Sequence, residues 1–285
     1  MWDAPNKPLG LPITIYTTDS TKKAKVQIKD SKDAVIRNLT FKIDTGFNRN
    51  YWSFEQKGNR AVGAPKTGGG GRRNMDDEAA APANEDDKEF TGRDVLAGKY
   101  KIIVSAGNQK DSVWVEVKDD PRLPSKNDIV LAQDAALEKL QPAVDKYNAA
   151  MDLIDDAELV LTGLKAEWKD KKDKGIDTLN KAHKAITEKI KDIRAYMMGK
   201  KQEKQGYGTV PVITPLGTIR NASMLIVGKN SVPAEQEQAA IQNAVTAANE
   251  IATKVNAFME KDWTEFRKLV EANPIKKFKE VELIK

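Results

Sequence analysis

The stretch DSVWVEVKDDPRLPSKND, residues 111–128, contains the point at which the apolar pattern of the chain changes. Every second residue from Val113 to Val117 is a valine, which is the period of a half-buried strand. After the two prolines, apolar residues recur every three or four positions, which is the period of an amphipathic helix. The sequence therefore predicts two domains, a β domain over 1–120 and a helical domain over 125–285.

The β domain is expected to contain six short strands. Alternating apolar and polar residues predict extended segments at 13–17, 25–29, 34–39, 47–54, 97–105 and 111–117. Two pairs of these segments are joined by short polar turns, which predicts two β-hairpins. Short strands with turns between them are typical of a sandwich, so the fold class predicted for this domain is an all-β Ig-like sandwich.

A long insertion is expected between two of these strands, over residues 57–92. It contains four consecutive glycines, Gly68–Gly71, and residues 74–89 include seven acidic residues against one lysine. Such a composition offers too little apolar surface to offset the entropy lost on ordering. The insertion is therefore predicted to be flexible.

The helical domain is predicted to be an all-α antiparallel helical bundle. Its first helix has one apolar face from Leu137 to Ile154, and a break or kink is expected at Pro142. A turn over 169–175 connects it to a second long helix, which makes an αα-hairpin. A third long helix is expected to start at Pro233, because proline is tolerated in the first helical turn. Each apolar face needs a partner, and three such helices can cover one another.

The composition excludes several classes of protein. The 285 residues contain no Cys, so disulfides, thiolate catalysis and zinc–thiolate sites are excluded. A net charge of +5 on 89 charged residues, with no recognisable module, does not predict nucleic-acid binding. No apolar run approaches the ~20 residues of a membrane span. Residues 1–5 lack a signal peptide and indicate a processed chain or a fragment boundary.

The titratable residues do not predict an enzyme. His183 is the only histidine, and lysines surround it on an amphipathic helix without an accompanying nucleophile motif. Asp155 and Asp156 are adjacent on a helix, where neighbouring side chains diverge by about 100°. Asp119 and Asp120 lie at the domain junction. Neither pair is expected to flank a shared substrate as glycosidase carboxylates do.

Metal and cofactor sites are not expected either. The acidic residues within 76–87 lack the spacing and the glycine of an EF-hand loop, and Gly68–Gly71 lacks the lysine of a phosphate loop. Two tryptophans in predicted strands, Trp52 and Trp114, are candidates for a sugar-binding platform. Packing in the core is the alternative role for both, because large aromatic residues dominate sandwich cores.

Four segments of the β half carry a resemblance to a known family: Trp2–Gly10, Gly46–Trp52, Ala97–Ile102 and Val117–Arg122. They are similar to the region that follows the β-propeller in secreted sortilin-like (Vps10-type, BNR-repeat) proteins of Bacteroidota-type bacteria. The resemblance implies a sandwich followed by a helical bundle, in the periplasm, at the cell surface or secreted. The repeats of the propeller itself are absent from this sequence, and the resemblance supplies no catalytic residue.

The predicted function is a non-catalytic interaction or structural module. Its expected partner is an upstream propeller domain or another surface protein. A second hypothesis is a carbohydrate-binding accessory region of a glycoside-hydrolase-like (sialidase or BNR-type) protein, which would bind glycan. Neither hypothesis includes a membrane span or a nucleic-acid partner.

Overall fold

The computed structural model describes residues 10–18, 22–66, 89–122, 127–168, 174–200 and 212–273. The chain divides into two compact units. The β unit contains residues Met1–Arg60 and Pro65–Asn127, and the helical unit contains Ala61–Ala64 and Asp128–Lys285. A four-residue loop from the β half of the sequence therefore belongs to the helical unit.

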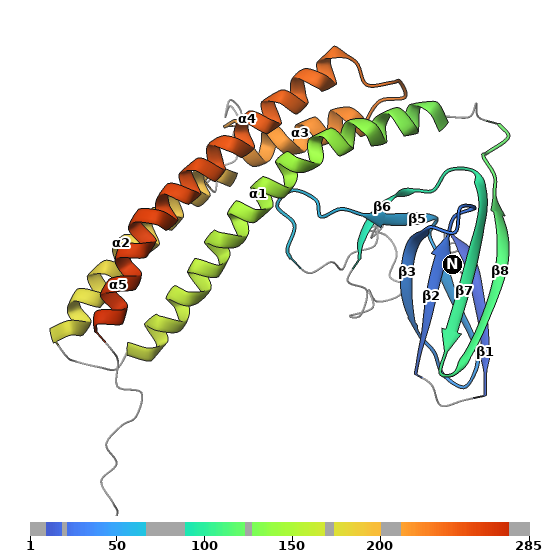
Figure 1. The fold of residues 1–285 in the computed structure, drawn as a ribbon, viewed down its shortest axis with the longest axis horizontal. Helices are drawn as coiled ribbons and strands as arrows, with labels where there is room; N and C mark the ends of the chain where they lie inside the picture. Colours follow the sequence, from blue (N-terminus) through green and yellow to red (C-terminus); the bar gives the residue numbers. More distant parts are fainter. Residues whose placement is uncertain are drawn as a thin grey trace, which may run out of the picture. The chain divides into compact units, whose positions relative to one another are not determined.

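The described strands of the β unit form three sheets (Figure 1). A four-stranded antiparallel sheet has the order β3-β2-β7-β8, β1 pairs with β4, and β5 pairs with β6. The strands are β1 Leu11–Thr17, β2 Lys23–Lys29, β3 Val35–Lys42, β4 Gly46–Trp52, β5 Glu55–Gly58, β6 Phe90–Asp94, β7 Gly98–Ala106 and β8 Gln109–Val117. The two hairpins predicted from the sequence are confirmed as the pairs β2–β3 and β7–β8.

The core of the β unit lies between the β1–β4 ribbon and one face of the four-stranded sheet. Ile13 and Ile15 of β1 share this core with Val26 and Ile28 of β2 and with Trp52 of β4. Along β1 and β2 every second side chain is buried, as the two-residue period requires. The opposite face of the four-stranded sheet consequently carries mainly polar side chains.

The helical unit has four helical stretches in its described residues. They are α1 Asn127–Trp168, α2 Lys174–Met198, α3 Pro215–Val227, and α4 Glu235–Ala257, which continues through the π-helical turn η1 Phe258–Trp263 into α5 Thr264–Ala272. Apolar residues from all of them form one core. The Thr214 hydroxyl caps α3 by accepting a hydrogen bond from the Gly217 N–H at 3.1 Å.

The Ala61–Ala64 loop is part of the helical core. Val62 is only 8% exposed and belongs to the same apolar cluster as the helices. Asn148 of α1, 3% exposed, accepts a hydrogen bond from the Gly63 N–H at 2.8 Å and donates one to the Ala61 carbonyl at 3.2 Å. Gly63 has φ +72°, and a Cβ there would lie 3.0 Å from Leu216 Cδ1. Glycine therefore fits this position without the strain and the close contact that a larger residue would bring.

The buried Glu237 organises the start of α4. Its carboxylate accepts hydrogen bonds from Lys229 Nζ and from the Ala234 N–H, both at 2.7 Å. The Lys229 ammonium first, and the Ala234 N–H second, hold the pKa of Glu237 below its ordinary value. These contacts favour the charged form of the carboxylate. It lies at the N-terminal end of α4, where the helix macrodipole also favours a negative charge.

The predicted fold class, an all-β Ig-like sandwich followed by an all-α antiparallel helical bundle, is wrong. The chain is a mixed structure in which roughly 54% of the described residues are helical and 26% are in strands. Its strands form separate sheets of two, four and two strands, and a helical bundle is not established. Apolar periodicity identifies the buried face of an element, but it contains no information on sheet order or on which segments share a core.

Three local predictions also need correction. Of the break or kink expected at Pro142, the break is wrong, because α1 continues through this residue. Helix α4 starts at Glu235 rather than at Pro233. The predicted flexible insertion over 57–92 has structured ends, because residues 55–58 and 90–94 pair as β5 and β6 and the intervening loop 61–64 is in the helical core. Residues 67–88 lie outside the described part of the chain.

Replacing Asn148 with alanine should destabilise the protein by about 1–3 kcal/mol, because it leaves the Gly63 N–H and the Ala61 carbonyl without their partner. Urea denaturation measures this loss. Limited trypsin digestion should show faster cleavage at Arg60 and Lys66, which flank the loop. The exposed Asn243 of α4 is a matched control, and its alanine variant should change neither property.

Replacing Glu237 with glutamine should lower the melting temperature at neutral pH. Because the folded-state pKa of Glu237 is depressed, its charge stabilises the fold above the unfolded-state value, and the stabilisation is lost as the pH falls through the folded pKa. The melting temperatures of the two proteins should therefore converge in acid. Glu235→Gln, at an exposed position of the same helical turn, is the control. A pH-independent difference for E237Q would contradict this account.

Candidate functional site

The most exposed tryptophan of the described chain, Trp114, lies on the edge strand β8. Val115 and Val117 of this strand pack against the core of the β unit, so the intervening side chains point to the other face of the sheet. The indole is 56% exposed. On the neighbouring strand β7, Lys101 is directly opposite Trp114, and its ammonium lies 5.9 Å from the ring centroid. This distance allows a cation–π interaction.

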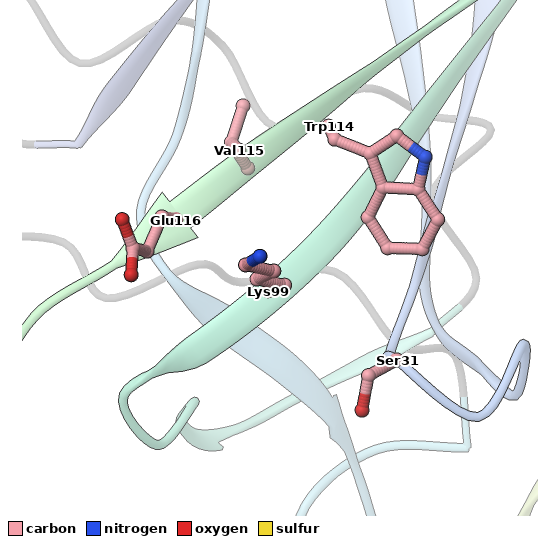
Figure 2. Close-up of a pocket in the computed structure, with 5 residues that line it drawn as sticks. All are labelled: Ser31, Lys99, Trp114, Val115 and Glu116. Atoms are coloured by element: carbon pink, nitrogen blue, oxygen red, sulfur yellow. The ribbon is translucent and has the colours of Figure 1, made fainter.

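A recess of about 460 Å³ opens beside this indole. Figure 2 shows the ring leaning from β8 across β7, with Lys99 and Glu116 on one side and Ser31 of the β2–β3 turn on the other. The recess therefore combines an aromatic face with an ammonium, a carboxylate and a hydroxyl group. Its volume is within the range of small-molecule sites, which combine an apolar surface with a few polar groups.

Trp52, the other predicted ligand-binding residue, has a different position. It is 1% exposed, and its indole N–H donates a hydrogen bond to the Glu55 carbonyl at 2.9 Å. Its ring packs against Phe54 and Tyr100, with centroid distances of 5.5 and 5.8 Å. Trp52 is thus a core residue whose ring cannot stack on a ligand, and the structure does not bring it together with Trp114 in one site.

A second exposed aromatic feature was not predicted from the sequence. Tyr16 of β1 and Phe47 of β4 are opposite each other in the register, with ring centroids 4.8 Å apart. Phe47 is 82% exposed. The two strands are separated in sequence by β2 and β3, so the local pattern carries no signal that would pair these rings.

His183 makes structural contacts on helix α2. Its Nε2 lies 3.0 Å from the Leu161 carbonyl, and its ring packs edge-on against Trp168 at 5.8 Å. A recess of about 510 Å³ lies beside His183, and half of its lining residues are lysines. Two of these lysines, Lys165 and Lys191, are hydrogen-bonded to Asn180 and Glu188 respectively, each at 2.8 Å. The Thr187 hydroxyl lies 3.4 Å from His183 Nδ1, but it donates its hydrogen bond to the His183 carbonyl at 2.8 Å, so its proton is directed to the backbone and not to the ring.

One carboxylate of each adjacent pair, Asp155 and Asp120, is engaged in an ion pair. Arg194 of α2 binds both Asp155 and Glu158 of α1, and these hydrogen bonds, first to Glu158, raise the pKa of the guanidinium. Asp120 accepts hydrogen bonds from Arg122, which lower the pKa of its carboxyl. Neither arrangement places two carboxylates across a cleft, as glycoside hydrolysis requires.

The described residues contain no group of three or more His, Cys, Asp and Glu side chains that could hold a metal ion. The acidic residues of 76–87 and the glycines Gly68–Gly71 lie outside the described ranges. Among the described helices, none combines the length and the apolarity that crossing a bilayer demands.

One deeply buried hydroxyl is unsatisfied. The Tyr147 side chain of α1 is fully enclosed, and its hydroxyl has no hydrogen-bond partner among the described residues. Burial raises its pKa to about 12, so the phenol stays protonated at neutral pH. A neutral phenol that belongs to the apolar cluster of the helical core acts as a packing residue.

Comparisons with known proteins give no relative for this chain. No protein-family model, no curated protein and no solved structure matches it. The resemblance to the sortilin-like family thus stays a prediction from the sequence, and the function has to be inferred from the geometry of the candidate site.

The two tryptophans of the predicted platform should differ sharply in their effect on stability. Trp52→Ala should reduce the free energy of unfolding by about 3–5 kcal/mol, because it empties part of the core. Trp114→Ala should change it by less than about 0.5 kcal/mol, because the indole is mainly exposed. Urea denaturation followed by far-UV circular dichroism measures both. Equal losses would contradict the assignment of Trp114 to the surface.

Proposed function

We propose that this chain is a non-catalytic interaction module that binds its ligand at the Trp114 recess. The observation that carries the proposal is a half-exposed indole placed beside polar groups on the face of the sheet that is turned away from the core. Leaving a large aromatic ring in contact with water has a cost that ligand binding would remove. Aromatic residues of this kind are typical centres of binding surfaces.

Carbohydrate is the ligand that suits this recess. A sugar ring has an apolar C–H face that can pack on an indole, and hydroxyl groups around its rim that need hydrogen-bond partners. Ser31, Lys99 and Glu116 supply a hydroxyl, a donor and an acceptor around the ring of Trp114. This arrangement supports the carbohydrate-binding hypothesis more directly than any other observation.

A protein partner is the second candidate, favoured by the exposed pair Tyr16–Phe47. Contiguous exposed aromatic rings are enriched where proteins contact each other. The resemblance to the region after a sortilin-like propeller supports an upstream propeller domain or another surface protein as that partner, in the periplasm, at the cell surface or secreted. In that setting the chain would brace or present a neighbouring domain.

Replacing Trp114 with alanine should abolish glycan binding by the full chain on a glycan array, while circular dichroism stays unchanged. The control is Phe47→Ala, which removes an even more exposed ring from a different sheet and should leave glycan binding intact. If the F47A variant alone loses binding, or if the unmodified chain binds a protein partner and no glycan, the carbohydrate assignment is wrong.

A further inference from the structure

The outer face of the four-stranded sheet, which includes Trp114, is rich in lysine. Lysines from all four strands project from it, and we refer to them as the lysine face. They are Lys23, Lys25 and Lys29 of β2, Lys42 of β3, Lys99 and Lys101 of β7, and Lys110 of β8.

The register places these side chains on one surface. Lys29 is opposite Lys101 in the β2–β7 pair, and Lys101 is opposite Trp114 in the β7–β8 pair. Directly opposed residues of antiparallel strands lie on the same face of a sheet. On β7 the lysines alternate with the buried Tyr100 and Ile102, which confirms that they point away from the core.

The charges on this face are close enough to act together. Adjacent strands lie about 4.8 Å apart, and same-face residues along a strand lie about 7 Å apart. These spacings are within the Debye length of roughly 8 Å at physiological ionic strength, so the fields of neighbouring ammonium groups add. Acidic residues weaken this field: Asp33 pairs with Lys29 at 3.0 Å, Glu116 pairs with Lys118 at 3.4 Å, and the Glu89 carboxylate lies at the margin of the face beside Asn38.

Neutral polar groups fill the space between the lysines. Gln27 of β2 donates a hydrogen bond to Asn38 of β3 at 3.2 Å. On its other side Gln27 is opposite Ile103 of β7, which is in turn opposite Ser112 of β8. At the margin of the sheet, Asn38 also donates to the Glu89 carboxylate at 2.8 Å. The face therefore offers amides and hydroxyls as well as positive charge, which suits a ligand that carries both hydroxyl and acidic groups.

We propose that the lysine face binds an anionic polysaccharide whose acidic groups contact the lysines while one sugar ring stacks on Trp114. This inference rests on the proposed function and adds the charge of the ligand to it. The charge complementarity is local, since the whole chain carries only +5.

Other polyanions fit this face less well. All cations of the lysine face are ammonium groups, and the planar guanidinium fork that suits phosphate is not among them. Single-stranded nucleic acids bind by stacking successive bases on several aromatic rings. The described residues on the outer face of these four strands include one such ring, Trp114. An acidic peptide would leave the indole and the hydroxyl-binding groups without a role.

The test is isothermal titration calorimetry of the full chain with polygalacturonate, alginate and chondroitin sulfate. The neutral comparison is fully methyl-esterified polygalacturonate, which keeps the sugar backbone and loses the charge. We expect binding to at least one of the three anionic polymers, weaker binding to the neutral ester, and a dissociation constant that rises with salt.

A charge variant and a matched control locate the site. The face variant replaces three exposed lysines of three strands and leaves the Lys101–Trp114 contact in place: Lys25→Gln, Lys99→Gln and Lys110→Gln. The control removes the same charge from exposed positions on the helices: Lys139→Gln, Lys184→Gln and Lys268→Gln. The face variant should bind the anionic polymer about tenfold more weakly, and the control should bind as the unmodified chain does. Circular dichroism melting curves verify that both variants are folded.

The outcomes separate this inference from the proposed function. Equal affinity for the neutral ester and the acid form would overturn the anionic assignment and leave a carbohydrate-binding module. Loss of binding in the control instead of the face variant would place the site on the helices and overturn the inference. Tighter binding of single-stranded DNA or polyglutamate than of any anionic polysaccharide would overturn it as well. Absence of binding to all sugars, neutral and anionic, would remove both the inference and the carbohydrate proposal.

Discussion

The amide of Asn148 is buried in an apolar core, where its oxygen and nitrogen must find hydrogen-bond partners within the protein. Both partners come from the Ala61–Ala64 loop, so this loop has to leave the β half of the chain and enter the helical unit. Val62 then fills space among the helices. The chain therefore crosses between its two units three times, after Arg60, before Pro65 and after Asn127.

The period of the sequence predicted local structure well and long-range pairing poorly. The alternation of valines over 113–117 predicted the strand β8, but core packing and a surface platform both stayed open for Trp114, and its exposed position follows from the packing of Val115 and Val117 against the core. In the 47–54 run, aromatic residues occupy both faces, so the pattern could not show that Trp52 points inward. That choice depends on the pairing of β4 with β1, two strands that are not neighbours in the sequence. The same lack of long-range information led to the wrong fold class.

The candidate site also depends on contacts that no local pattern contains. Trp114 was identified from the sequence, but Ser31 and Lys99 reach the recess from other strands and turns. Only the register of β2, β7 and β8 brings them to one surface. The lysines of this face look in the sequence like the ordinary solvent-facing residues of amphipathic strands. Their common direction becomes visible once the order of the strands is known.

The Ala61–Ala64 loop has a consequence for the order in which the protein is made. The ribosome adds Gly63 to the chain 85 residues before it adds Asn148. The Ala61–Ala64 loop is therefore complete long before the helices that bury it. Domains tend to fold as units from the N-terminus during synthesis, and contacts between distant residues form late. When the β unit leaves the ribosome, the helices that bury Val62 have not yet been synthesised. Nascent chains of this protein expose that valine until helix α1 has left the exit tunnel.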